Sequence, residues 1–281
     1  MRRPVVMSLV VLPLLLGVAP ACGSKDGETT GSPATGASTT GATNPEPGAM
    51  CAQGSSPIMA AYDIDSGAFQ WVACAEGGGM FLAVAASADR VWVEEPGETT
   101  QQFVLDAATG EVLDAASAGE VPDDADHWTK GPPSAEGVHV RGGQDDPLVG
   151  VDTATGAVVW QAAGHPYFDN VWAHGDGAVF VDAWDPTGAT PGGWIAAYEI
   201  VSGAERWRWA QEGTYASPWH VTGERLFAMG PDLWVLDTQD GTVLWHTSYG
   251  ESATGYPRMF GALANDDSVF LAFTSVPSGG D

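Results

Sequence analysis

Residues 151–160 read VDTATGAVVW, and this pattern decides the fold: an Asp, a Gly four residues later, and a Trp four residues after the Gly. The pattern recurs along the chain, with Glu in place of Asp once and without the Trp once. The five copies are Asp63, Gly67 and Trp71; Asp106 and Gly110; Asp152, Gly156 and Trp160; Glu199, Gly203 and Trp207; and Asp237, Gly241 and Trp245.

The spacing of these anchors has a direct structural meaning. A period of roughly 45 residues indicates supersecondary units that must stack on their neighbours to bury their apolar faces. The Asp side chain can accept a backbone N–H two residues on, and the Gly supplies a positive φ without steric cost. The Trp then lies on the returning strand, where it can bury a large face against the next unit.

Short apolar segments fill each unit. In the interval before Trp207 they are 170–173, 178–181, 194–198 and 204–207, separated by Gly, Asp, Pro or Asn. Such segments indicate strands joined by tight turns, and hairpins are expected at 176–177, 223–224 and 264–267. No stretch of ten residues after residue 50 has clean helical periodicity. An all-β fold with four strands per unit is typical of a β-propeller.

The motif Asp-x-x-Thr-Gly-x-x-x-Trp resembles the pyrrolo-quinoline quinone (PQQ) repeat over roughly residues 55–281. That repeat is a propeller blade of quinoprotein dehydrogenases. It also occurs in non-enzymatic envelope lipoproteins, including the lipoprotein of the outer-membrane β-barrel assembly machinery. A WD40 propeller is disfavoured, because Trp184-Asp185 occurs once and outside the repeat register. The resemblance implies a fold more strongly than a function.

Two copies depart from the motif. Asp114 stands where the Trp belongs after Gly110, and Glu199 replaces the Asp of the fourth copy. We therefore expect the blade that contains Asp114 to pack more loosely than the others.

The repeats provide about five blades, and the chain begins and ends with half a unit. Segment 58–74 is the second half of a unit, and segment 259–273 is the first half of one. Either these halves form one blade and close a five-bladed ring, or the chain is a fragment that lacks further blades. The polar tail 277–281, where another anchor turn would be due, favours the fragment.

The start of the chain predicts export. Residues 1–22 have a basic start and an apolar stretch too short to span a bilayer well, and they end at Cys22. We expect a lipoprotein signal peptide with Cys22 as the lipidation site; Pro20 leaves a plain secretory signal as the alternative. Residues 23–50, of Gly, Ser, Thr, Ala and Pro, predict a disordered tether before a propeller domain at 51–281. The protein is thus expected on the extracytoplasmic side of a membrane, in the periplasm or at the cell surface.

Once Cys22 is assigned to lipid, the two remaining cysteines form one even pair. In an exported protein Cys51 and Cys74 are expected to form a disulfide. The sequence has no Cys-x-x-Cys or His-x-His spacing, so we expect no metal site.

The chain is strongly acidic. It carries 36 Asp and Glu against 10 Lys and Arg, a formal net charge of −26 at pH 7. Nucleic acid and anionic membrane surfaces are therefore poor partners, and membrane contact is expected through the N-terminal lipid only. Solubility explains such a charge without a ligand; attraction of a basic partner or of divalent cations is the functional alternative.

No catalytic set is visible. The quinoprotein enzymes that this repeat resembles have an adjacent Cys pair, a Ca²⁺ site and a catalytic Asp. This sequence has no Cys-Cys dipeptide and no Asp that maps onto the catalytic one. Gly-x-Ser-x-Gly, a Walker loop and His-Glu-x-x-His are also absent from the sequence. We expect no catalytic residue and no PQQ cofactor.

A set of aromatic and basic residues lies between each anchor turn and the next innermost strand. At the mouth of a central channel they could stack on a sugar, a quinone or a peptide side chain, or only pack the loops and the channel. The set is His127, Trp128, Tyr167, Tyr215, Trp219, His220, Tyr256 and Arg258.

These observations favour a non-catalytic, lipid-anchored propeller that binds an envelope protein or an extracytoplasmic ligand. A PQQ-dependent oxidoreductase, or a fragment of one, is the alternative from another class. A carbohydrate-binding module is a third possibility.

Overall fold

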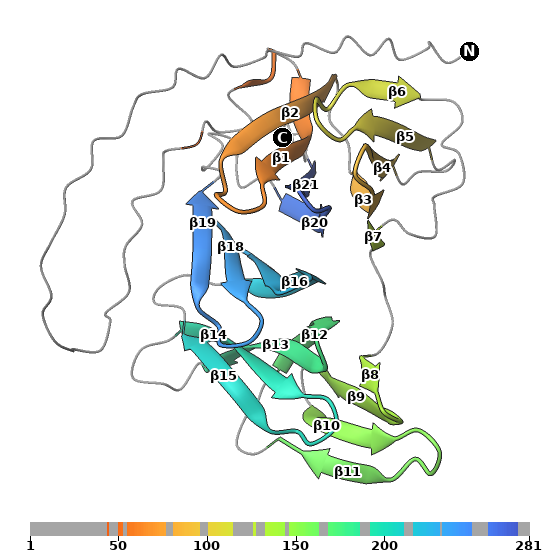
Figure 1. The fold of residues 1–281 in the computed structure, drawn as a ribbon, viewed down its shortest axis with the longest axis vertical. Coiled ribbons are helices and arrows are strands. Elements are labelled where there is room, and N and C mark those ends of the chain that lie inside the picture. Colours follow the sequence, from red (N-terminus) through yellow and green to blue (C-terminus); the bar gives the residue numbers. More distant parts are fainter. Residues whose placement is uncertain are drawn as a thin grey trace, which may run out of the picture.

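The structure is a computed structural model of the chain (Figure 1). It describes residues 44, 50–52, 55–76, 81–95, 101–114, 126–127, 133–143, 146–162, 168–185, 192–210, 216–230, 232–248 and 258–274. The predicted signal peptide, Cys22 and nearly all of the predicted tether lie outside the described residues.

The described residues form five antiparallel sheets, which we call blades 1 to 5. Blade 1 consists of β20 (Arg258–Ala264), β21 (Ser268–Thr274), β1 (Ser55–Asp63) and β2 (Phe69–Glu76). Blade 2 consists of β7 (Asp126–His127), β3 (Leu82–Ala86), β4 (Arg90–Glu95), β5 (Gln101–Asp106) and β6 (Val112–Asp114). Blade 3 consists of β8 (Ser134–Ala135), β9 (Val138–Gly143), β10 (Asp146–Asp152) and β11 (Val158–Gln161). Blade 4 consists of β12 (Phe168–Gly175), β13 (Ala178–Asp185), β14 (Gly192–Glu199) and β15 (Glu205–Ala210), and blade 5 of β16 (Ser217–Thr222), β17 (Arg225–Met229), β18 (Asp232–Asp237) and β19 (Val243–Ser248).

The hairpins expected from the sequence are present. In blade 4, Asp176 and Gly177 both have positive φ, of 50° and 70°, between the paired strands β12 and β13. Two central residues of positive φ define the turn whose twist matches that of the flanking strands. The turns at 223–224 and 265–267 likewise connect β16 to β17 and β20 to β21.

Blade 1 is built from both ends of the domain. Strand β1 pairs antiparallel with β21, in a register that runs from Met59 opposite Ala272 to Asp63 opposite Ser268. The two half units predicted at 58–74 and 259–273 therefore share one sheet. A disulfide between Cys51 and Cys74, with a Cα–Cα distance of 5.8 Å, ties the chain before β1 to β2.

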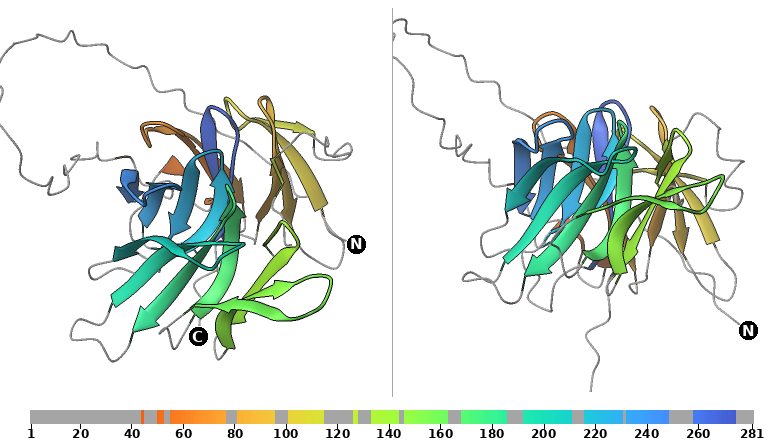
Figure 2. Two further views of the ribbon diagram at one scale, coloured as in Figure 1. Left: turned by 60° about the horizontal axis from the view of Figure 1, so that its bottom comes forward. Right: turned by 90° about the horizontal axis from the view of Figure 1, so that it is seen from below.

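The blades stand side by side along an arc (Figures 1 and 2). Contacts between strands connect blade 3 to blade 4 through β9 and β12, blade 4 to blade 5 through β12 and β16, blade 5 to blade 1 through β16 and β20, and blade 1 to blade 2 through β20 and β3. Blades 2 and 3 are the two ends of the arc, which is open between them in Figure 1. The fold is thus a five-bladed β-propeller arrangement whose ring is not closed by hydrogen bonds between these two sheets.

The hydrophobic core is divided among the junctions between blades. Four clusters of buried side chains each draw on two adjacent blades, at junctions 1–2, 5–1, 3–4 and 4–5. The fifth cluster, of Ala85, Trp92 and Val104, comes from blade 2 alone. Among the described residues, blades 2 and 3 share no buried cluster. We call the region between these two blades the open junction. In this part of the chain no helix has the length and apolarity needed to cross a bilayer.

Candidate functional site

The five anchor turns have one common geometry. Each anchor Gly has a φ between 69° and 73° and donates its N–H to the carbonyl of the Asp or Glu four residues before it. In the third turn, Asp152 Oδ1 accepts hydrogen bonds from Thr155 N and Thr155 Oγ1, both at 2.7 Å. The hydrogen bonds from Thr155 lower the pKa of Asp152. Local side-chain contacts therefore form the turn without help from a neighbouring blade.

Four of the turns receive a Trp from the preceding blade, and we call each such turn a Trp socket. The indole ring lies against the anchor Gly, and the indole N–H donates to the carbonyl of the residue that follows the Asp or Glu. The four pairs are Trp71 Nε1 to Ala107 O at 2.9 Å, Trp160 Nε1 to Ile200 O at 2.8 Å, Trp207 Nε1 to Thr238 O at 2.9 Å, and Trp245 Nε1 to Ile64 O at 2.8 Å.

The sockets require glycine for a second reason besides φ. A Cβ at Gly203 would lie 2.5 Å from the ring of Trp160, and a Cβ at Gly241 would lie 2.6 Å from the ring of Trp207. No real Cβ contact is that short, so any larger residue would displace the indole. The motif thus couples the anchor Gly of one blade to the Trp of the previous one.

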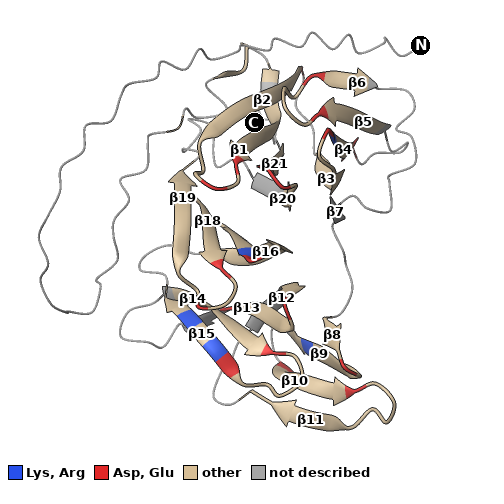
Figure 3. Cartoon of the chain, in the orientation of Figure 1, with Lys and Arg blue, Asp and Glu red and all other residues tan. Residues whose placement is uncertain are grey.

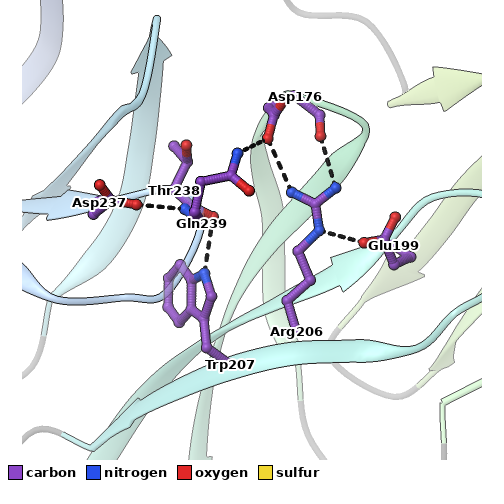
Figure 4. A network of polar contacts seen from close by, with 7 residues as sticks. All are labelled: Asp176, Glu199, Arg206, Trp207, Asp237, Thr238 and Gln239. Carbon is purple, nitrogen blue, oxygen red and sulfur yellow. Dashed lines mark hydrogen bonds and ion pairs between the residues drawn. The ribbon is translucent and has the colours of Figure 1, made fainter.

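Junction 4–5 shows a filled socket in detail (Figure 4). Beside Trp207, the guanidinium of Arg206 donates to Asp176 Oδ2 at 3.1 Å and to Asp176 O at 2.8 Å. Gln239 of blade 5 also donates to the Asp176 carboxylate. In this polar network the contact between Gln239 and Asp176 joins the two blades.

The same network accounts for one departure from the motif. Glu199, which replaces Asp in the fourth copy, accepts a hydrogen bond from Arg206 Nε. This contact is the leading cause that raises the pKa of Arg206. The longer side chain thus pairs with the adjacent strand β15.

The anchor turn of blade 3 has no Trp. No described side chain lies within 4 Å of a Cβ placed on Gly156, although its φ of 72° equals that of Gly110. Thr153 follows Asp152 as Thr238 follows Asp237, so its carbonyl is the equivalent of the one that accepts the indole N–H in the socket of blade 5. Thr153 is exposed, whereas Thr238 has an exposed fraction of 0%. Gly156 is likewise exposed. We call this turn, residues 152–156, the open socket.

Val158 shows the same difference. Two residues after the anchor Gly, the apolar counterparts Phe69, Val112 and Val243 are partly buried and pack against the clusters of junctions 5–1, 1–2 and 4–5. The fourth counterpart, Glu205, is charged and exposed. Val158 is 53% exposed. The apolar residue that would contact blade 2 is therefore uncovered by the described part of the chain.

The missing Trp is a substitution and not a slip of register. On β6, Asp114 pairs with Val104, two residues before the anchor Asp106. Trp207 pairs with Ala197 at the same offset from Glu199, and Trp245 pairs with Val235 at the same offset from Asp237. Asp114 therefore occupies the strand position that supplies the Trp elsewhere, and its blade is one of the two at the opening of the arc.

The rim of the open socket is acidic. The N–H of Thr153 donates to Gly137 O at 2.8 Å, which places the hairpin with the exposed Glu136 beside the turn that contains Asp152. Within the described residues, neither carboxylate forms an ion pair. Figure 3 shows that Asp and Glu lie largely at such turns and strand ends, whereas Lys and Arg are few.

Only two of the eight predicted channel residues, Trp219 and His220, have described side chains, and the channel site stays a prediction. Trp219 packs against the cluster of junction 5–1, and buried His220 stacks on Phe227 with a centroid separation of 6.2 Å. Both lie on β16 and contribute to packing there. His127 lies in β7 and Arg258 begins β20, but only their backbones are described. Trp128, Tyr167, Tyr215 and Tyr256 lie outside the described residues.

Sequence reasoning missed other residues at the junctions. Thr153 and Val158 have unremarkable identities, and they stand out only when their exposure is compared with that of their counterparts. Asp182 of β13, buried to 1% exposure, accepts a hydrogen bond from Ser217 Oγ of β16. In the sequence, only its neighbours Trp184-Asp185 match a known motif, that of WD40 repeats. Among described side chains, no group of three or more His, Cys, Asp or Glu is placed to hold a metal ion.

Comparison with known proteins gives one family match. Residues 151–279 match the model of a family described as outer membrane protein assembly factor BamB. The matched range covers the third anchor turn, β11 and all of blades 4 and 5. No curated protein sequence matches the chain.

Solved propeller structures are similar at low identity. BamB from Moraxella catarrhalis is 14% identical, with a TM-score of 0.36, over 75% of this chain and 65% of its own. A quinohemoprotein alcohol dehydrogenase from Pseudomonas putida HK5 is 13% identical, with a TM-score of 0.35, over 69% and 41%. The corresponding enzyme from Comamonas testosteroni is 13% identical, with a TM-score of 0.35, over 72% and 38%. This chain thus spans less than two thirds of the length of each.

The repeats, the five sheets and the family match together identify the chain as a PQQ-like repeat β-propeller. This fold is common to assembly factors and dehydrogenases, so it does not choose between them.

Proposed function

We propose that this protein is a non-catalytic scaffold of the cell envelope that binds another envelope protein at the open junction between blades 2 and 3. The observation that carries the proposal is the exposure of Thr153, Gly156 and Val158. The counterparts of Thr153 and Gly156 in the four other blades are buried or partly buried, and the apolar counterparts of Val158 are partly buried. A surface with the composition of a blade interface is well suited to bind a protein.

The envelope location is supported by two independent features. The sequence begins with a predicted lipoprotein signal that ends at Cys22, followed by a Gly- and Ser-rich tether. The family whose model matches residues 151–279 is described as an outer membrane protein assembly factor. Both support a lipid-anchored protein that acts on the extracytoplasmic side through contacts with other proteins.

Site-specific photo-crosslinking in the native envelope tests the proposal. A photo-reactive amino acid replaces Val158 in the open junction, and, as a matched control, Leu244, which is 43% exposed on the outer strand of blade 5. We expect position 158 to crosslink to one envelope protein in stoichiometric yield and position 244 not to do so. Equal crosslinking from both positions, or none from position 158, would remove the basis of the proposal.

An activity assay separates this proposal from the enzyme alternative. The purified protein is incubated with PQQ, Ca²⁺ and a panel of alcohols, and reduction of an artificial electron-accepting dye is followed. We expect a rate equal to that of the buffer. Saturable, PQQ-dependent dye reduction would show that the protein is an oxidoreductase.

A further inference from the structure

We propose that the open socket of blade 3 is a binding site for a Trp side chain carried by an extended, basic segment of a partner protein. The inference rests on the proposed protein-binding function and specifies its chemistry. It differs from the predicted channel site, because Trp219 and His220 pack within the fold and do not contact the open socket.

The chain itself defines the ligand. In all four filled sockets the group held against the anchor Gly is an indole, and in all four its N–H donates to the same carbonyl, at 2.8 or 2.9 Å. A flat ring fits because glycine leaves the turn without a Cβ, and the carbonyl selects a ring with an N–H donor. Among side chains, Trp alone combines this area with a donor at that position.

Blade 3 presents the same elements, uncovered. Gly156 has the φ of a filled socket, and Asp152 and Thr155 form the same capped turn as Asp106 and Thr109. No described residue donates a hydrogen bond to the Thr153 carbonyl. The site therefore needs no rearrangement to accept an indole, which lowers the entropic cost of binding.

The strands that carry the four socket Trp residues indicate the backbone conformation of the segment that would bind. Every Trp in a filled socket lies on the outermost strand of a blade: β2, β11, β15 or β19. The segment that enters the open socket is therefore expected to be extended. The carboxylates of Asp152 and Glu136 at the rim form no ion pair within the described residues; together with the net charge of −26 they favour a segment that carries Lys or Arg.

A peptide from the chain itself provides a defined probe. Residues 204–210, AERWRWA, contain the outermost strand β15 and carry Trp207, Trp209 and two Arg residues. The blocked synthetic peptide is titrated into ¹⁵N-labelled protein, and the amide signal of Gly156 is followed by NMR. We expect saturable binding with a ring-current shift of that signal. The control peptide with both Trp207→Ala and Trp209→Ala is expected to bind at least about tenfold more weakly.

Two matched variants test the location. Asn tolerates positive φ, so Gly156→Asn should fold while its side chain fills the space of the indole. Gly223→Asn is the control, because Gly223 has a φ of 54°, has no described side chain within 4 Å of an added Cβ, and lies in the β16–β17 hairpin. We expect Gly156→Asn to weaken peptide binding by about tenfold or more and Gly223→Asn to leave it unchanged.

The outcomes separate this inference from the proposed function. Equal binding to the wild type and to Gly156→Asn, equal binding of the Trp-free peptide, or no shift of Gly156 at millimolar peptide would overturn the Trp site. In that case a crosslink from position 158 would still support the proposed protein-binding function. If instead Gly156→Asn removes both peptide binding and the position-158 crosslink, the partner enters through the Trp socket. A concentration-dependent dimer of the wild type that Gly156→Asn abolishes would identify a second copy as the occupant and overturn a separate partner.

Discussion

Junction 4–5 and the open junction are built from the same repeat, yet only one of them is packed. At junction 4–5, Trp207 fills the turn of Gly241, and ten buried residues from both blades form one cluster. At the open junction, Asp114 stands at the Trp position, and Gly156 and Val158 are exposed. The two anchor turns differ little in backbone, so the difference lies in the residue that the preceding blade supplies.

This comparison indicates how stability is distributed in the molecule. A repeat array is stabilised mainly by interfaces between neighbours, and each junction is then a separate contribution. Four junctions hold the array together with an indole that is buried or, for Trp160, partly buried. Among the described residues the open junction has no such indole, and we expect it to contribute less to folding.

The largest effect is expected from removal of a socket Trp. Trp207→Ala removes a buried indole and its hydrogen bond to Thr238 O, and should lower the free energy of unfolding by about 3–5 kcal/mol. Urea denaturation followed by far-UV circular dichroism measures the loss. The matched substitution at the open junction, Asp114→Ala, should change stability by less than about 0.5 kcal/mol. Similar losses for the two variants would show that the junctions are equivalent.

Glycine substitutions should separate ring contact from backbone strain. Gly203→Ala and Gly156→Ala both place a Cβ at a φ of 70° or 72°, which costs about 1–2 kcal/mol. At Gly203 the Cβ also lies 2.5 Å from the Trp160 ring, which should add about 1–3 kcal/mol. Thermal unfolding of the two variants gives the difference. A loss at Gly156 as large as that at Gly203 would mean that an indole occupies the open socket in the free protein.

A Trp at position 114 should make the open junction similar to a filled one. Asp114→Trp supplies an indole at the strand position, paired with Val104, that provides the Trp in the other blades. Burial of that ring should raise the free energy of unfolding by about 1–2 kcal/mol and compete with the peptide of residues 204–210. Urea denaturation and the peptide titration test both effects. An unchanged stability would show that the two blades do not approach closely enough for the contact.

The sequence predicted the fold because its signals are local and repeated. Positive φ at Gly67 and the four other anchors and the hairpin at 176–177 each follow from residues close together in the chain. The half units at 58–74 and 259–273 left two alternatives open, since pairing of β1 with β21 depends on distant residues. The open socket was not predicted, because the exposure of Thr153 depends on a contact that the neighbouring blade does not make.

The smallest effect concerns acid titration, and it tests whether the open socket is preformed. The hydrogen bond from Ser66 lowers the pKa of Asp63 in a filled socket, and the hydrogen bond from Thr155 lowers the pKa of Asp152 in the open one. A lowered folded-state pKa stabilises the protein above the ordinary Asp value of about 3.9, and this stabilisation is lost as the pH falls through the folded-state pKa.

We therefore expect Ser66→Ala to raise the pKa of Asp63 and Thr155→Val to raise that of Asp152, with no effect of either on titration at the other turn. NMR titration of the carboxyl carbons measures both values. If Asp152 titrates in the wild type at its ordinary value, the turn of blade 3 is not held in the socket conformation without a Trp. If both groups titrate below it, the turn forms from its own residues, and the incoming indole finds a site that is already built.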